Sequence, residues 1–194
     1  MKERPILFKG AMVRAILDGS KTQTRRIMNP QPKPTPADYP GTSGHWWPSN
    51  AVQSMVHIEE QMQQWTGLAG DCCPYGDHGD QLWVRETHSI VPDHDEPAGC
   101  SAVLYQADGG APYGKWKPSI HMFREHSGIQ LEIVSVRVER LQAISVEDAL
   151  AEGITHRTMN DPRVEYQHLW EDINGAGSWD VNPWVWVVEF KRAK

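Results

Sequence analysis

The chain has 194 residues, a length typical of one domain with a substantial buried core. Hydrophobic residues make up 39% and charged residues 23% of the sequence, a balance typical of globular proteins, and no apolar run is long enough to span a membrane. The formal net charge of −6 argues against broad, nonspecific binding of nucleic acid, although it is compatible with a local basic patch.

The cysteines and histidines predict neither a disulfide framework nor a metal site. Three cysteines are an odd number, and Cys72, Cys73, Cys100 and His78 lack the paired C-x-x-C spacing of zinc sites. No histidine falls in a zinc-hydrolase or zinc-deaminase motif. We therefore expect no metal and no other cofactor. Because charged residues flank the short apolar run at 5–8, we expect no signal peptide and a cytoplasmic location.

The start of the chain predicts a strand, a helix and a basic turn. Residues 5–8 predict a short strand, and residues 10–18 a helix that ends at Gly19, because glycine readily adopts the positive φ of a helix C-terminus. Lys21 and Thr24 lie three residues apart, so a helical turn would place both on one face. An isolated K-x-x-T pattern is most simply a solvated turn. A lysine beside a threonine hydroxyl is also one way to activate a weak nucleophile.

Residues 29–78 predict an insertion. Residues 29–44 are rich in Pro, Thr, Ser and Gly, and a second turn-rich stretch runs from 67 to 79. Two adjacent tryptophans, Trp46 and Trp47, stand between these stretches. Insertions of this length are commonly functional lids or disordered loops, and the paired tryptophans favour a lid that packs on the rest of the fold.

Strands predominate in the middle and at the end of the chain. Apolar runs of strand length cover residues 81–86, 101–107 and 184–190. Residues 129–141 alternate between apolar and polar positions, and the alternation shifts at Val134 and Ser135, where a β-bulge would restore the phase. The predicted core positions in these strands are Leu82, Val84, Ile133, Val136, Val185 and Val187.

Two helices are predicted between the last two strands. Ser145, with Asp148 three residues on, resembles a capping box and begins a helix that runs through Glu152. Asp161 and Pro162 begin the second helix, since proline is favoured at the first helical position. No β-α-β alternation appears, so we predict a single α+β domain over residues 1–194 with a mixed barrel rather than a doubly wound sheet.

Three stretches resemble landmarks of the ASCH domain family. Gly19-x-Lys21 followed by Arg26 matches the G-x-K-x-x-x-x-R signature of that family. Residues 79–86, with the sequence GDQLWVRE, resemble its second landmark, and residues 179–190 resemble the closing strand of phage and prophage members. The chain is therefore similar to a phage-type member, for which the expected location is the cytoplasm of the host.

This resemblance implies a fold and an activity. The fold is a PUA-like mixed β-barrel with peripheral helices, a lid-like insertion at about residues 29–78, and a cleft for a nucleoside or RNA. One bacterial branch consists of amidohydrolases that remove acyl groups from the exocyclic nitrogen of cytidine, as in N4-acetylcytidine. The lysine, threonine and glutamate of that branch correspond to Lys21, Thr24 and Glu86. Members of the branch are shorter and have no insertion. The identity of the substrate is therefore the property that this resemblance predicts least well.

The three residues suit the implied reaction. Thr24 would act as the nucleophile or orient it, Lys21 would activate it as a base, and Glu86 would pass a proton to the leaving amine. The structural alternatives are a turn hydroxyl for Thr24, a solvated cation for Lys21, and an ion pair with Arg85 or Arg26 for Glu86. The expected substrate-binding residues, which supply polar contacts or aromatic walls for a base, are Ser20, Arg26, Trp46, Trp47, Trp83, Trp116 and Lys117.

Three hypotheses for function follow. The first is an amidohydrolase that removes an acyl group from the exocyclic nitrogen of a cytidine-type nucleoside or base. The second is an RNA-binding PUA-like module that uses the same basic cleft without catalysis, and the third is a ribonuclease. The acidic composition and the Lys-Thr-Glu set favour the first, with a small nucleoside or modified base as the partner and RNA as the alternative. No membrane partner is expected.

Overall fold

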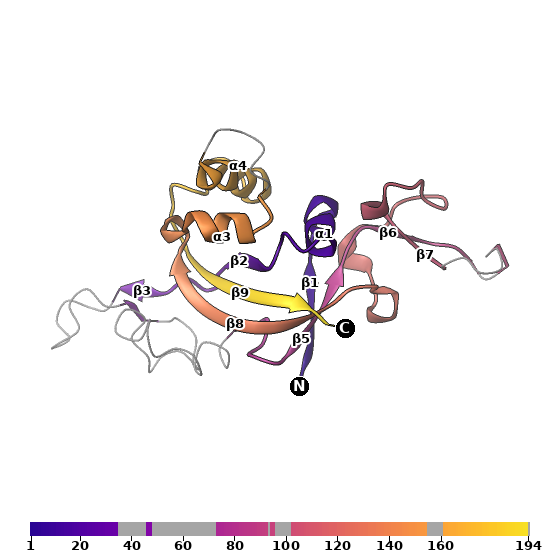
Figure 1. Ribbon diagram of the computed structural model, residues 1–194, viewed down its shortest axis with the longest axis horizontal. Helices are drawn as coiled ribbons and strands as arrows, with labels where there is room; N and C mark the ends of the chain where they lie inside the picture. The colour runs from indigo at the N-terminus through magenta and orange to yellow at the C-terminus, as the bar shows by residue number, and fades with distance from the viewer. Residues whose placement is uncertain (35–45, 48–72, 93, 96–101, 155–160, 194) are drawn as a thin grey trace.

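The structure, a computed structural model, describes residues 1–34, 46–47, 73–92, 94–95, 102–154 and 161–193. A five-stranded mixed sheet forms its centre, with the spatial order β1-β5-β8-β9-β2 (Figure 1). Its strands are β1 (Glu3–Leu7), β2 (Gln23–Ile27), β5 (Gln81–Arg85), β8 (Gln130–Arg140) and β9 (Trp184–Arg192). The α-helices are α1 (Gly10–Leu17), α3 (Val146–Ala151) and α4 (Pro162–Asn174).

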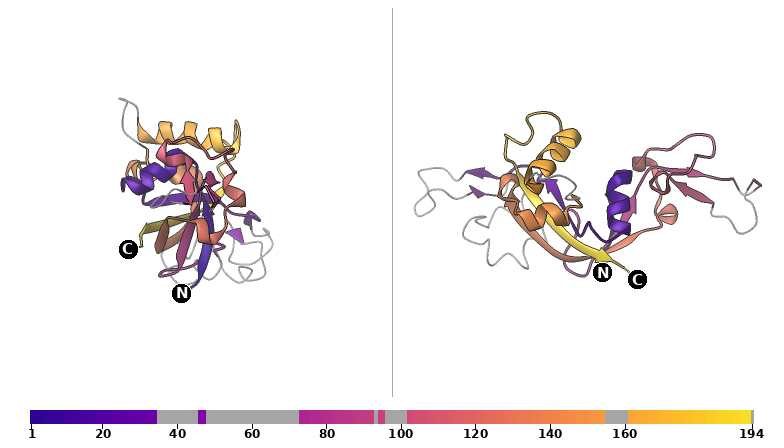
Figure 2. Two further views of the ribbon diagram at one scale, coloured as in Figure 1. Left: turned by 90° about the vertical axis from the view of Figure 1, so that its right-hand side faces the viewer. Right: turned by 45° about the horizontal axis from the view of Figure 1, so that its top comes forward.

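Smaller elements are attached to this sheet. Two short antiparallel pairs are formed by β3 (Lys33–Pro34) with β4 (Trp46–Trp47) and by β6 (His88–Ile90) with β7 (Val103–Tyr105). Single turns of 3-10 helix are η1 (Gln106–Asp108), η2 (Ser119–His121), η3 (Arg124–His126) and η4 (Leu141–Ala143). The β6–β7 pair and the helices α3 and α4 lie toward opposite ends of the molecule, with α1 between them (Figures 1 and 2).

The central sheet is mixed and open. β1 and β5 run parallel, whereas the other neighbouring strands are antiparallel. β8 and β9 form a long curved ribbon, and a register shift between Ile133 and Ser135 confirms the predicted bulge (Figure 1). Within the described residues the edge strands β1 and β2 do not pair with each other, so the structure shows an α+β fold with an open mixed sheet and not the closed barrel that the sequence predicted.

The sheet separates two hydrophobic clusters. The larger cluster includes Leu82, Val84 and Ile133, and Val136 packs against it half-buried. The smaller cluster contains Val185 and Val187 together with side chains of α3 and α4, so the six predicted core positions are confirmed but divide between the two clusters. β9 is buried on both faces, which explains why its sequence shows a continuous apolar run instead of alternation.

The helix termini follow the local sequence signals. Gly19 has a φ of +82° just after α1, and the Ser145 hydroxyl accepts a hydrogen bond from the Asp148 amide at 3.0 Å at the start of α3. Pro162 is the first residue of α4, as predicted. None of the helices in the described part of the chain combines the length and the apolar character needed to cross a bilayer.

The predicted lid lies mostly outside the described residues. Residues 35–45 and 48–72 lie outside the described residues, whereas the two ends of the predicted insertion, residues 29–34 and 73–78, and the backbone pairing of β3 with β4 are described. The prediction that Trp46 or Trp47 packs on the fold or lines a cavity therefore stays a prediction. Cys72 and Cys100 also lie outside the described residues, whereas Cys73 is a buried free thiol.

Candidate functional site

The candidate site is built on β2. Gln23, Thr24 and Arg25 are all buried in this strand, and Thr24 pairs in register with Val188 of β9. The helical turn predicted for Lys21 and Thr24 is wrong, because the segment is extended and Lys21 forms a β-bridge with Glu152. Sequence patterns missed this strand because its polar side chains are buried by hydrogen bonds and ion pairs, not by apolar packing.

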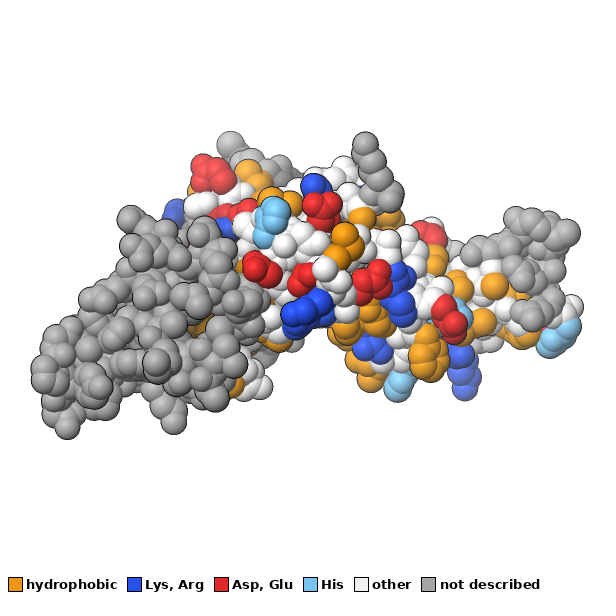
Figure 3. Space-filling view, turned by 90° about the horizontal axis from the view of Figure 1, so that it is seen from below, with side chains coloured by type: hydrophobic (Ala, Val, Ile, Leu, Met, Phe, Trp, Pro, Cys, Tyr) orange, Lys and Arg blue, Asp and Glu red, His pale blue; other side chains and the backbone are white. Residues whose placement is uncertain are grey.

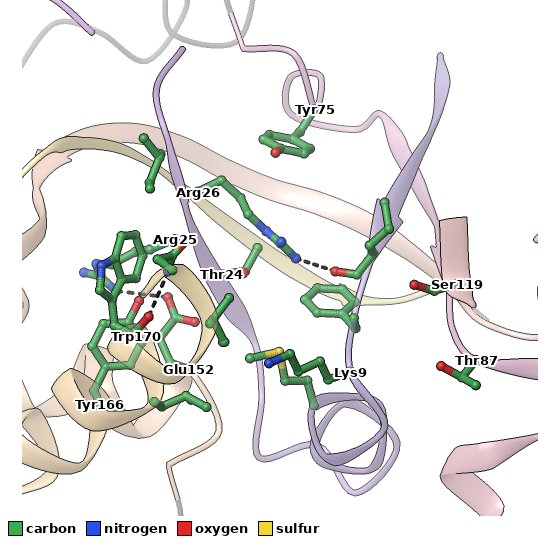
Figure 4. Close-up of a pocket in the computed structure, with 17 residues that line it drawn as sticks. Lys9, Thr24, Arg25, Arg26, Tyr75, Thr87, Ser119, Glu152, Tyr166 and Trp170 are labelled. Atoms are coloured by element: carbon green, nitrogen blue, oxygen red, sulfur yellow. Dashed lines mark hydrogen bonds and ion pairs between the residues drawn. The ribbon is translucent and has the colours of Figure 1, made fainter. Parts of the chain in front are cut away.

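A cavity of about 370 Å³ opens beside β2. This volume lies in the range of small-molecule sites. The aromatic residues that line it are Phe8, Tyr75, Tyr166 and Trp170, and the polar or charged ones are Lys9, Thr24, Arg25, Arg26, Thr87, Ser119, Glu152 and Asn174. Thr24 and Arg26, two residues apart in the strand, project to the same side, while Glu152 lies beside Arg25, Tyr166 and Trp170, and Thr87 and Ser119 lie across the cavity (Figure 4).

Lys21 lies at the edge of this cavity as a buried cation. Its side chain is 1% exposed, and its ammonium donates to the carbonyl of Gln23, the carbonyl of Glu152 and Oε2 of Glu152, each at 2.8 Å. These three acceptors use all three ammonium protons. Burial lowers the pKa of Lys21 and outweighs Glu152, which raises it. Lys21 itself is not among the described residues that line the cavity.

Glu152 is the carboxylate that faces Lys21. It directly follows α3 and is 4% exposed, and the next residue, Gly153, has a φ of +88°. A Cβ atom at Gly153 would lie 3.0 Å from Cβ of Lys21 and 3.1 Å from Cβ of Ala15, so the glycine lets the α3 terminus approach Lys21 closely. No local sequence pattern predicts this pair, because 131 residues separate its members.

Arg26 is the best available donor for a developing oxyanion. The nearby backbone amides of Ser20, Lys21 and Thr22 already donate to Asp18 Oδ1, the Ala15 carbonyl and the Ala151 carbonyl. The Arg26 guanidinium lies 5.2 Å from the centre of the Phe8 ring and donates to the Leu7 carbonyl at 2.6 Å. Its Nε atom is buried and has no hydrogen-bond partner within the described residues.

Glu86 is buried in a different environment. It continues the buried face of Leu82 and Val84 at the end of β5, and it is 3% exposed. Burial, with a smaller effect of the Asp108 carboxylate, raises the pKa of Glu86 to about 7. Glu86 is absent from the described residues that line the cavity, and Lys21 donates to Glu152 instead. The sequence predicted Glu86 as the carboxylate beside Lys21, but in the structure this carboxylate is Glu152.

Four other expected binding residues are absent from the described lining of this cavity. Ser20 is exposed and donates to Asp18 Oδ1 at 2.6 Å. Trp83 is half-buried with the Arg85 guanidinium 5.5 Å from its ring centre. Trp116 is half-buried and Lys117 is exposed, and neither is among the described residues that line the cavity. Of the predicted residues whose side chains the structure describes, Thr24 and Arg26 line it.

The aromatic walls come from residues that the sequence did not single out. Tyr166 and Trp170 lie four apart in α4, with ring centres 6.2 Å apart, and Phe8 directly follows β1. These residues line one cavity because α4 and β1 pack around β2, so no local sequence motif predicts their position there. Within the described residues, no group of three His, Cys, Asp or Glu side chains could hold a metal ion.

Comparison with known proteins gives one structural similarity. The sequence matches no family model and no curated protein. The structure is similar to the crystal structure of an ASCH domain from Lactobacillus crispatus JV V101, with a TM-score of 0.45 and 10% sequence identity over 98% of this chain and 79% of that chain. At this identity and score, the similarity does not by itself assign the chain to a family.

Proposed function

We propose that the protein is an amidohydrolase that removes an acyl group from the exocyclic nitrogen of a cytidine-type nucleoside or base. The observation that carries this proposal is that Thr24 and Glu152 line one cavity, with the Lys21 ammonium 2.8 Å from Glu152 Oε2 behind them. A hydroxyl, a carboxylate and a buried amine form a set that can move a proton to and from an attacking oxygen. Phe8, Tyr166 and Trp170 supply apolar walls for a base.

The reaction requires an attack on the acyl carbon. The Thr24 hydroxyl, or a water that it orients, bonds to this carbon as Glu152 accepts the proton, and the carbonyl oxygen becomes an oxyanion beside Arg26. The carbon–nitrogen bond then breaks, and the proton passes from Glu152 to the leaving nitrogen. Water hydrolyses any acyl-threonine ester, so that the overall reaction consumes one water and yields the amine and a carboxylic acid.

Glu152 takes the proton-transfer role in this scheme because of its position. It lines the cavity together with Thr24, whereas Lys21 lies behind it with its three protons already donated. A group that exchanges a proton with the substrate must come within hydrogen-bond reach of it, directly or through one water. Lys21 then holds Glu152 in place and shares a proton with it through the contact to its Oε2 atom.

Binding of RNA without catalysis is the second candidate. Lys9 and Arg26 both line the cavity, and no carboxylate pairs with either of them in the described part of the chain, which favours an anionic ligand. A continuous basic stripe leading away from the cavity would favour this candidate further. The underside of the molecule, seen in Figure 3, carries Lys and Arg side chains interspersed with Asp and Glu. We place RNA binding second because the net charge of −6 argues against broad binding of nucleic acid.

Substitution of Thr24 tests the proposed function. With N4-acetylcytidine and other N-acylated nucleosides as substrates, we expect the wild-type protein to release the free acid, measured by chromatography. Thr24→Ala should lower kcat by about a hundredfold, because Glu152 could still activate a water in the vacated space. Thr24→Ser keeps the hydroxyl and should retain more activity than Thr24→Ala. Equal activity of Thr24→Ala and wild type would exclude the hydroxyl from the reaction.

A further inference from the structure

Arg25 is a buried cation that pairs with three carboxylates at once. Its side chain has no exposed surface, and its guanidinium nitrogens lie 2.7 Å from Asp148, 2.9 Å from Glu139 and 3.4 Å from Glu152. Burial disfavours the charge of Arg25, but Glu152 and Glu139 outweigh it, so the pKa of Arg25 lies above its ordinary value. Since a guanidinium does not lose its proton in proteins, Arg25 is a permanent positive charge inside the fold.

Glu152 is shared between this cation and Lys21. Its Oε2 atom accepts from Lys21 Nζ at 2.8 Å, whereas its Oε1 atom faces Arg25 Nη1 at 3.4 Å (Figure 4). Contacts to both oxygens fix the orientation of the carboxylate, because it can rotate only by breaking one of them. The positive charge of Arg25 also offsets part of the negative charge of Glu152, which weakens the attraction between Glu152 and Lys21. In addition, the charge of Arg25 repels the Lys21 ammonium.

We propose that Arg25 is a positioning residue, whose contact with Glu152 Oε1 holds this carboxylate between the cavity and Lys21 so that the Lys21–Glu152 pair can exchange a proton during the reaction. This inference rests on the proposed hydrolytic function. The structural reason is that one carboxylate bridges two cations of different kinds, of which only the lysine can deprotonate. Lys21 gives its proton to Glu152 only as Glu152 passes its own proton to the leaving nitrogen, and Lys21 recovers a proton from the water that hydrolyses the acyl ester.

The groups around Lys21 act in the direction that the proposal requires. Burial lowers the pKa of Lys21, Glu152 raises it, and Arg26 and Arg25 lower it further. Tyr166 of α4 faces the same group of charges, and burial raises its pKa well above the ordinary value, so the phenol stays neutral at working pH.

A second arginine allows the role of Arg25 to be separated from simple charge pairing. Arg137 also binds Glu139 and Asp148, with its Nη2 atom 3.0 Å from Asp148 Oδ1, but it makes no contact with Glu152 within the described residues. Glu139 and Asp148 therefore keep a cationic partner when Arg25 is replaced. Arg137→Gln removes a cation from the same cluster without touching Glu152, which makes it the matched control for Arg25→Gln.

The proton affinity of Lys21 tests the proposal without any substrate. In the full-length protein labelled with [13C]lysine, the Cε signal of Lys21, assigned by its loss in Lys21→Met, is followed against pH by NMR. Arg25→Gln should shift the Lys21 titration midpoint upward, because the positive charge of Arg25 lowers the pKa of Lys21. Arg25→Lys keeps a cation near Asp148 but cannot hold all three carboxylates, so its shift should have the same sign and a smaller size.

The outcomes separate this inference from the proposed function. Arg137→Gln should leave the Lys21 midpoint unchanged. If Arg25→Gln does not fold, Arg25→Lys alone decides, and a folded Arg25 variant with an unchanged Lys21 midpoint overturns the inference even if acyl groups are released. If the midpoint rises and the acid limb of the kcat profile moves with it, the inference holds. A raised midpoint without turnover of any acylated nucleoside leaves the electrostatic role of Arg25 in place and rejects the hydrolytic function.

Discussion

Replacing Lys21 by methionine is expected to lower kcat for acyl release by about a thousandfold, within the range typical of lost acid–base partners. Methionine keeps an unbranched apolar stem in the buried space, but it has no ammonium to bind Glu152 Oε2. The carboxylate then keeps only its contact with Arg25 Nη1 and loses the partner with which it shares a proton. The measurement is the steady-state rate of acyl release, with circular dichroism to verify the fold.

The same substitution removes two further hydrogen bonds. The carbonyls of Gln23 and Glu152 lose the Lys21 ammonium as donor, and each buried acceptor left unsatisfied costs about 1–3 kcal/mol. The melting temperature must therefore be measured alongside the rate, and assays run well below it. Lys115→Met, which removes an exposed lysine outside the cavity, is the control and should leave kcat unchanged. A folded Lys21→Met protein with wild-type kcat would refute the assigned role of Lys21.

The second large effect concerns stability and comes from Glu86. Its pKa is raised from the ordinary 4.5 to about 7, mainly by burial, so the folded protein keeps a proton on Glu86 where the unfolded chain has lost it. Between about pH 4.5 and pH 7 the native state binds more protons, and stability must fall as the pH rises through this window. A shift of this size corresponds to about 3 kcal/mol of stability lost by pH 8.

Glu86→Gln should remove this pH dependence. The amide stays neutral, so the free energy of unfolding of the variant at pH 8 should exceed that of wild type by up to about 3 kcal/mol, while the two should be similar near pH 4.5. Urea unfolding across this pH range measures the effect. Glu125→Gln is the control, because the Glu125 side chain is 77% exposed and its replacement should leave the pH dependence unchanged. Parallel pH profiles for wild type and Glu86→Gln would contradict the assignment.

Local sequence signals predicted the elements that depend on local physics. The β-bulge at Val134 and Ser135 was visible because the apolar alternation of β8 shifts there, and the start of α3 was visible because Ser145 and Asp148 satisfy the first-turn amides. Apolar runs marked β5 and β9 for the same reason, since burial demands apolar side chains. These features need no knowledge of the partner strands.

Features that depend on distant partners could not be predicted in this way. β2 was missed because Arg25 is buried by carboxylates on β8 and α3, which no pattern around Arg25 reveals. Glu152 was missed as the partner of Lys21 because the contact forms only when the end of α3 packs beside the turn after α1. Glu86 was favoured in its place because the resemblance to the ASCH amidohydrolases implied that their glutamate corresponds to Glu86. The position of its side chain relative to Lys21, however, is a property of the whole sheet.

The central claim is that Glu152, and not Glu86, is the carboxylate that accepts the proton when the Thr24 hydroxyl, or a water that it orients, attacks the acyl carbon. Both glutamates are buried, and the change to glutamine is chemically the same at each, so each variant controls for the other. The most direct test is the kcat of acyl release from N4-acetylcytidine by Glu152→Gln and by Glu86→Gln, compared with wild type at one pH. The account predicts a loss of about a thousandfold for Glu152→Gln and near wild-type turnover for Glu86→Gln. Near wild-type turnover by a folded Glu152→Gln protein, with activity lost in Glu86→Gln, would contradict it.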